Sequence, residues 1–226
     1  MNYKIIGSTI PAVEVELNRG EAMFTQSGGM SWQSDGIEMS TNTRGGVLKG
    51  IGRMFAGESM FMAHYRTLRD HAAIAFASTV PGSIVPIEVG SANGLILQKG
   101  AFLCAEDSVH LETIFTKKFT SGFFGGEGFI LQRLTGSGKA FLEIDGDIVQ
   151  KELKPGEVIK VDTENVAAFT PNVSYEIETV KGMGNILFGG EGLFLTKLTG
   201  PEKVILQTMN FADFAGRIAA RIPSNG

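Results

Sequence analysis

Three histidines and one cysteine are the side chains of this chain best suited to metal binding or nucleophilic catalysis. His64, His71 and His110 follow neither an HxH nor an HExxH spacing, and Cys104 stands six residues before His110 without a second thiol. A zinc centre or a Cys-His catalytic pair needs a complete ligand set or an orienting partner, and none can be named here. The sequence therefore predicts no metal site and no cofactor.

Two pairs of acids, Asp145 with Asp147 and Glu14 with Glu16, have a spacing that places both carboxylates on one face of a strand or beside a turn. General acid-base catalysis requires environments that push the two pKa values apart. No flanking residue predicts such a difference, so these acids are interpreted as solvated.

The segment TGSGKAFL, residues 135–142, is similar to part of a nucleotide-binding P-loop. A P-loop has glycine five positions before Gly138 and Ser or Thr after its lysine, whereas this chain has Arg133 and Ala140 there. A strand pattern follows, in place of a helix whose N-terminus would receive a phosphate. The segment is therefore interpreted as a β-turn, and no catalytic residue is predicted.

Positive charge recurs in three glycine-containing segments, RGGVLKGIGRM at 44–54, TKKFTSGF at 116–123 and VKGMGNIL at 180–187. Apolar Met, Phe and Leu residues accompany the charges, a combination that can bind acidic lipid or another anion. Ordinary solubilising charge on exposed loops is the alternative. The candidate anion- or membrane-binding residues are Arg44, Lys49, Arg53, Lys117, Lys118 and Lys181.

These basic segments lead into a repeated phrase, FGGEG, which stands at 124–128 and 188–192, with a degraded copy, FAGES, at 55–59. An apolar run follows each copy, and the glutamates of the three copies lie 69 and then 64 residues apart. This spacing suits one small β-unit per copy. The sequence predicts one all-β domain, 1–226, made of three repeat units at about 15–80, 81–150 and 151–210.

The phrase itself has no catalytic spacing, so a structural role is predicted for it. Paired glycines permit a bulge or a tight bend, and the glutamate can cap backbone N–H groups. The repeat also places His64 at the position of Arg133 and Lys197. The residues of the repeat motif are Glu58, Gly125, Gly126, Glu127, Gly189, Gly190 and Glu191.

Short apolar runs separated by turn dipeptides predict the strands that hold these segments, in a sandwich or barrel. The runs are SIVPIEV, GLILQKGAFL, KAFLEI, DIVQKEL, EVIKVD and SYEIETV. Asp145-Gly146 predicts a hairpin over 141–150 with a type I′ turn. PGSIVPIEV at 81–89 and PGEVIKVDT at 155–163 are predicted to be equivalent beginnings of two units.

A short helix is predicted over 210–222, at the end of the chain. Apolar residues recur there at offsets of 3, 4 and 4, with Asn210 as the N-cap and Pro223 as the stop. The apolar stripe consists of Phe211, Phe214, Ile218 and Ile222. We expect this stripe to pack on the sheet, and a detachable partner-binding helix is the alternative.

Composition limits the class of protein. A chain of 226 residues with 43% hydrophobic content can bury a sizeable core. The formal charge of −4 argues against a polyanion held by bulk charge, so RNA is not the expected partner, although a local basic patch is compatible with it. A secretory signal, a transit peptide and an apolar run of about 18 residues are not found, so a cytoplasmic location is predicted.

The phrases PGSIVPIEV, LILQKGAFLCAEDSVHLE, FGGEGFILQRLTGSGKAFLE and FGGEGLFLTKLTGPEKVILQTM resemble the altered-inheritance-of-mitochondria-24 family. That family is placed in the superfamily of the tryptophan RNA-binding attenuator protein. The resemblance implies an all-β, attenuator-like β-sandwich or double-stranded β-helix with internally repeated units and an oligomer. In eukaryotes the family is associated with mitochondrial inner-membrane organisation, and no ligand residue is carried over.

We therefore predict a non-enzymatic, homo-oligomeric β-scaffold or binding protein that contacts anionic membrane surfaces or a protein partner. A small-ligand or RNA-binding module is the alternative, and it rests on the superfamily analogy alone.

Overall fold

The computed structural model describes residues 1–26, 28–42, 62–90, 94–117, 129–179 and 194–222. Almost all regular elements among them are strands, which confirms the all-β class. The first group is β1 (Asn2–Ile6), β2 (Ala12–Leu17), β3 (Ala22–Gln26), β4 (Met30–Gln33), β5 (Ile37–Asn42), β6 (Met62–Thr67) and β7 (Ala72–Ala77).

Two further groups of strands and a helix follow. The second group is β8 (Gly82–Val89), β9 (Leu95–Gln98), β10 (Phe102–Glu106), β11 (Val109–Lys117), β12 (Phe129–Gly136) and β13 (Gly138–Asp145). The third is β14 (Ile148–Leu153), β15 (Val158–Asp162), β16 (Val166–Phe169), β17 (Ser174–Thr179), β18 (Phe194–Thr199) and β19 (Glu202–Gln207). The helix α2 (Phe211–Ala219) comes last, as predicted.

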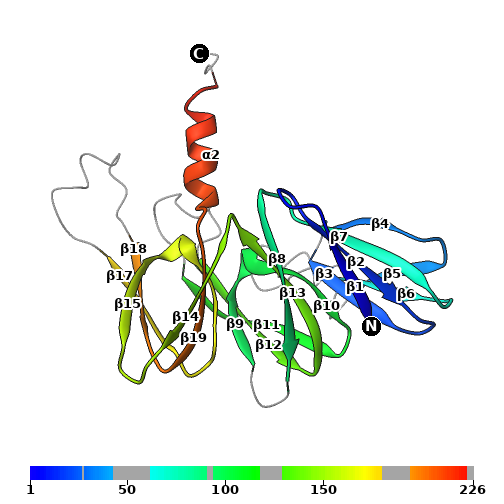
Figure 1. Ribbon diagram of the computed structural model, residues 1–226, viewed down its shortest axis with the longest axis horizontal. Coiled ribbons are helices and arrows are strands. Elements are labelled where there is room, and N and C mark those ends of the chain that lie inside the picture. The colour runs from blue at the N-terminus through cyan, green and yellow to red at the C-terminus, as the bar shows by residue number, and fades with distance from the viewer. Residues whose placement is uncertain (27, 43–61, 91–93, 118–128, 180–193, 223–226) are drawn as a thin grey trace.

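Four sheets hold these strands. Their strand orders are β1-β2-β7-β4 in the first sheet, β5-β6-β3-β10-β13-β8 in the second, β11-β12-β9-β16-β19-β14 in the third and β15-β18-β17 in the fourth. Figure 1 shows the three groups in a row, with β14–β19 at the left end and β1–β7 at the right end. The second and third sheets each combine strands of two neighbouring groups.

The same pairing order recurs in each group when β1 is set aside. The sixth strand pairs with the first and third, as β7 does with β2 and β4, and the fifth pairs with the second and fourth, as β6 does with β3 and β5. β13 and β12 repeat this order, and so do β19 and β18. In each group the pairing of the third strand with the sixth contains a register shift, at Met30/Trp32, Phe102/Cys104 and Val166/Ala168.

Neighbouring groups are joined by one further pairing of strands. The second strand of one group pairs with the third strand of the next, as β3 does with β10 and β9 does with β16. All of these pairings are antiparallel. They extend the hydrogen-bonded sheets across the boundaries between groups.

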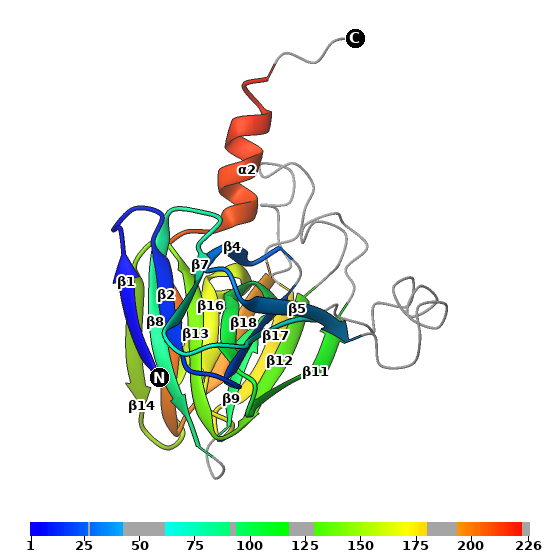
Figure 2. The same cartoon turned by 90° about the vertical axis from the view of Figure 1, so that its right-hand side faces the viewer.

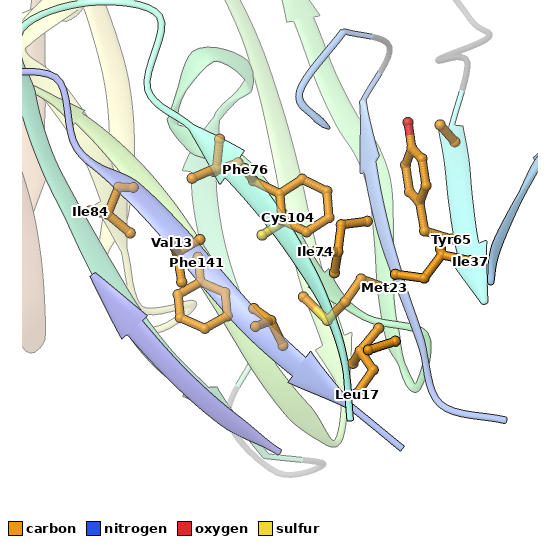
Figure 3. Close-up of a cluster of buried hydrophobic side chains, with 14 residues drawn as sticks. Val13, Leu17, Met23, Ile37, Tyr65, Ile74, Phe76, Ile84, Cys104 and Phe141 are labelled. Atoms are coloured by element: carbon orange, nitrogen blue, oxygen red, sulfur yellow. The ribbon is translucent and has the colours of Figure 1, made fainter. Parts of the chain in front are cut away.

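Three hydrophobic cores lie between successive sheets. In the first core, Val13 and Phe76 of the first sheet meet Met23, Tyr65 and Phe141 of the second, all almost inaccessible to solvent (Figure 3). The second core combines side chains of the second and third sheets, and the third core those of the third and fourth. Interior sheets therefore bury residues on both faces, which explains their nearly continuous apolar runs.

The predicted hairpin over 141–150 is wrong. β13 pairs with β8 and β10, whereas β14 pairs with β19 in another sheet. Both edges of β13 are taken by these long-range partners, so none is left for β14. The turn at Gly146, whose φ is +73°, carries the chain from one sheet to the next.

The predicted equivalence of the two Pro-Gly runs is also wrong. PGSIVPIEV forms β8, the first strand of its group, whereas PGEVIKVDT contains β15, the second strand of its group. The short 3₁₀ turns at Lys99–Ala101 and Thr163–Asn165 show the better correspondence, because each joins the second strand of a group to the third. The strand groups accordingly run over 12–77, 82–145 and 148–207.

The C-terminal helix starts as predicted but does not pack as predicted. The Asn210 side chain accepts a hydrogen bond from the Asp213 N–H at 3.0 Å, which confirms the N-cap. The helix ends at Ala219, three residues before the predicted bound of 222. Its Phe211, Phe214 and Ile218 side chains remain 40–49% exposed, and Ile222, beyond its end, is 65% exposed. Figures 1 and 2 show α2 projecting away from the sheets. The stripe at its surface is therefore uncovered, contrary to expectation.

Candidate functional site

Most of the predicted site residues lie outside the described residues. The structure accordingly does not test the anion-binding candidates Arg44, Lys49, Arg53, Lys118 and Lys181, or the repeat-motif residues Glu58, Gly125, Gly126, Glu127, Gly189, Gly190 and Glu191. Lys117 is the last residue of β11, and only its backbone position is described. The strands that flank these segments can be compared.

Each basic segment connects the fourth strand of its group to the fifth, namely β5 to β6, β11 to β12 and β17 to β18. The three residues that the repeated phrase aligns, His64, Arg133 and Lys197, lie on the fifth strands, opposite Ser40, Glu112 and Glu176 of the fourth strands. Lys197 forms an ion pair with Glu176 at 3.2 Å, on the strand opposite. Equivalent strand pairs thus flank all three basic segments.

His64 and His71 each pair with a carboxylate near the surface. His64 Nδ1 lies 2.8 Å from Asp107 Oδ1, and Arg66 approaches the other oxygen of the same carboxylate at 3.3 Å. His71 Nδ1 lies 2.5 Å from Glu16 Oε1, and this contact raises the pKa of His71. Each contact links neighbouring strands or turns.

Cys104 is fully buried in the first core, and burial raises the pKa of its thiol well above the usual range. The thiol is therefore protonated at neutral pH and unsuited to nucleophilic attack. Within the part of the chain that the structure describes, no group of three or more His, Cys, Asp and Glu side chains has an arrangement suited to a metal ion.

The C-terminal helix carries an exposed apolar feature, the α2 stripe, which we define as Phe211, Phe214, Ile218 and Ile222. These side chains are 48%, 40%, 49% and 65% exposed. Helical spacing brings Phe211, Phe214 and Ile218 to one side of α2, and Ile222 follows three residues after the helix ends. Arg217 and Arg221, both exposed, border the stripe. The result is an amphipathic surface with apolar side chains and two permanent positive charges.

Beneath the start of α2 lies a group of acids that were predicted to be solvated or were not recognised. Burial, with a smaller contribution from Glu143, raises the pKa of Asp145 to about 6, which corrects its interpretation as a solvated acid. Burial also raises the pKa of Glu164 to about 7, and the nearby charges of Asp162, Asp145 and Asp213 act in the same direction. Sequence spacing contained no signal for this group, because the end of β13, the 3₁₀ turn after β15 and the start of α2 contribute to it.

Glu164→Gln is expected to stabilise the protein at pH 8 by about 1–3 kcal/mol, since one pKa unit corresponds to about 1.4 kcal/mol. A pKa raised by folding means that the native state binds the proton more tightly. Its stabilising contribution is complete below about pH 4.5 and is lost as the pH rises through about 7. Urea unfolding at pH 4 and pH 8 measures the difference.

Glu178→Gln is the matched control, because the hydrogen bond from Lys160 lowers the pKa of Glu178. This variant should not be stabilised at pH 8. An equal change in stability at both pH values for Glu164→Gln would contradict the predicted titration of Glu164.

Among the described residues, the helix is too short to cross a bilayer. The family described as mitochondrial biogenesis AIM24 matches residues 3–209. An uncharacterised protein of Streptococcus pyogenes serotype M6 is 28% identical over 222 residues, which cover 95% of this chain and 88% of that protein. The X-ray crystal structure of a Streptococcus pyogenes protein matches with a TM-score of 0.80 and 26% identity, covering 98% of this chain and 99% of the other.

Proposed function

Since this chain belongs to the mitochondrial biogenesis AIM24 family, whose name concerns an organelle bounded by membranes, we propose that it is a non-enzymatic, oligomeric β-scaffold that contacts an anionic membrane surface. The observation that carries this proposal is the uncovered α2 stripe with its neighbouring arginines. The membrane is the occupant that matches both the apolar side chains and the positive charge.

The helix itself favours an occupant. Isolated helices of fewer than about 12 residues are marginal in water, and most helical stability in proteins comes from a packed apolar face. The nine residues of α2 have a good N-cap, but the Phe211, Phe214 and Ile218 side chains remain 40–49% exposed. An interfacial site in a bilayer covers the stripe and leaves Arg217 and Arg221 at the level of the lipid headgroups.

Each contribution to membrane affinity is modest. Complete burial of a Phe or Ile side chain is worth about 1.5–3 kcal/mol, and a basic residue near an anionic surface about 1 kcal/mol. Several helices in one oligomer add through effective concentration. The basic segments at 44–54, 116–123 and 180–187 are proposed as further contacts of the same kind.

Co-sedimentation with vesicles tests the proposal. Wild-type protein should pellet with phosphatidylcholine vesicles that contain phosphatidylserine, less so as salt increases, and poorly with phosphatidylcholine alone. The triple variant Phe211→Ser, Phe214→Ser and Ile218→Ser should bind at least 10-fold more weakly, because it removes the apolar contact while both arginines remain.

The control replaces exposed apolar residues away from α2, Met39→Ser in β5 and Leu68→Ser in the turn after β6, which are 59% and 51% exposed. It should bind like the wild type. If the wild type does not pellet at low ionic strength, the membrane proposal fails. A parallel titration with single-stranded RNA decides for the RNA-binding alternative if RNA alone is bound.

Three finer statements also belong to this proposal. The recurrence of one pairing order supports the interpretation of the groups as copies of one unit. The placement in the attenuator-like superfamily and the cytoplasmic location remain predictions. A small-ligand module is the remaining alternative.

A further inference from the structure

The two end sheets have the composition of two halves of an interior sheet. The second and third sheets share one order: the fourth, fifth and second strands of a group, followed by the third, sixth and first strands of the next group. The fourth sheet, β17-β18-β15, has the first half of this order and stops there. The first sheet begins with the second half, read as β4-β7-β2, and adds β1.

The strands at these two free ends are exposed where their interior counterparts are buried. β10 and β16 occupy the third position in their groups and are almost entirely buried, whereas three of the four residues of β4 are exposed. β3 is likewise buried, whereas β15 alternates between exposed and half-buried residues. The two free edges therefore belong to a second strand, β15, and a third strand, β4. Elsewhere in the chain, the second strand of one group pairs with the third strand of the next.

We infer that β15 of one copy pairs antiparallel with β4 of a second copy. This pairing joins the two end sheets into one sheet with the strand order of the second and third sheets. The combined order is β17-β18-β15-β4-β7-β2-β1. This inference specifies the surface behind the oligomeric part of the proposed function and rests on that part, but it does not depend on membrane binding.

The internal pairings also specify the register. Cys104 lies opposite Thr25 and Ala105 opposite Phe24, and Ala168 and Phe169 lie opposite Leu97 and Ile96 in the same way. Trp32 occupies the position of Cys104 and Ala168, immediately after the shared register shift. Val161 corresponds to Thr25 and Leu97, because these three residues of the second strands lie opposite Thr196, Ala63 and Gln132 of the fifth strands. Trp32 of one copy should therefore face Val161 of the next, and Gln33 should face Lys160.

A second copy is required because β4 and β15 lie at opposite ends of the row of groups (Figure 1). The interface uses two different edges, so it is heterologous, and successive copies form either a closed ring or an open filament. The first strands of the groups form another kind of edge: β8 and β14 have no partner on that side among the described residues, and β1 covers the corresponding edge of β2. No pairing between one group and the next uses this edge, so the chain offers no template there for a second copy.

The side chains are suited to such a contact. Trp32 is 44% exposed, although its counterparts Cys104 and Ala168 are completely buried. Val161 packs against the third core, so pairing would place the indole beside an apolar neighbour. Gln33 and Lys160, by contrast, replace the apolar pairs found inside the chain. The contact between copies is therefore more polar than those within a copy, as suits copies that fold first and assemble afterwards.

Cysteine cross-linking between different variants tests the edge and its direction. The native Cys104 is buried, so introduced thiols dominate the reaction. Opposite residues of antiparallel strands have Cβ atoms about 4.5–5.5 Å apart, close to the range of a disulfide. Trp32→Cys and Val161→Cys are prepared separately, and an equal mixture under mild oxidation should yield a cross-linked dimer. Each variant alone should yield at least 10-fold less.

The control mixes Trp32→Cys with Val149→Cys, which places the thiol on the edge strand β14 at a residue 37% exposed. It should give only background cross-linking. The exposed pair Gln33→Cys and Lys160→Cys repeats the test if circular dichroism shows that either first variant is misfolded.

The outcomes separate this inference from the proposed function. Light scattering should report a multiple of the 24.2 kDa chain. A monomer at micromolar concentration would overturn both the inference and the oligomeric scaffold. An oligomer without the mixed cross-link, or with Trp32→Cys dimers formed by that variant alone, would overturn the β15–β4 edge only. Vesicle binding tests the membrane part of the proposed function, and neither the light-scattering result nor the cross-linking result decides it.

Discussion

Phe141→Ala is expected to lower the free energy of unfolding by about 3–5 kcal/mol, the usual cost of truncating a buried aromatic side chain. Phe141 is completely buried in the middle of β13, and its ring meets that of Tyr3 edge-on with the ring centroids 5.0 Å apart. It belongs to the second strand group but fills the first core (Figure 3). The variant therefore leaves a cavity where two groups join, and urea unfolding measures the loss.

Phe214→Ala provides the matched control, because it removes the same atoms from a side chain that is 40% exposed on α2. Its effect on unfolding should stay within about 0.5 kcal/mol. Similar losses for the two variants would mean that Phe214 is packed in solution, and the exposed stripe would then have to be abandoned.

Gly136→Ala is the second substitution with a large expected effect, a loss of about 2–4 kcal/mol. Gly136 ends β12 with φ of +92°, a left-handed conformation that costs about 1–3 kcal/mol for other residues. An added methyl group would in addition collide with the backbone carbonyl oxygen of Ser108, which cannot move without disturbing the turn before β11. Thermal and urea unfolding should both show the loss.

Gly156→Ala separates the two causes of that loss. Gly156 has φ of +77°, but nothing lies within 4 Å of the position of an added methyl group. This variant should lose only the conformational part, about 1 kcal/mol. If it is as unstable as Gly136→Ala, the close approach to Ser108 contributes nothing.

Local patterns in the sequence were sufficient for the features that depend on neighbouring residues. The segment SYEIET forms a strand because side chains alternate between the faces of a sheet, and Asn210 caps α2 because its side chain reaches the Asp213 N–H one turn away. The shared position of His64, Arg133 and Lys197 also followed from the repeated phrase.

Other features depend on which surfaces meet in space. The Asp145-Gly146 dipeptide has the same local chemistry in a hairpin and in a crossover, and it forms a crossover because β8 and β10 already occupy both edges of β13. The high pKa of Glu164 arises from burial and from acids at distant positions in the chain. Spacing along the chain carries no information about either.

The sequence by itself determined that the chain forms short strands and that a capped amphipathic helix follows them, since neighbouring residues decide both. Only the tertiary structure decided which strands pair, that β4 and β15 each pair with one strand alone among the described residues, and that the α2 stripe stays exposed. These outcomes depend on long-range contacts between edges and faces. An amphipathic pattern specifies that a face favours an apolar environment, and the assembled fold decides whether the chain itself supplies it.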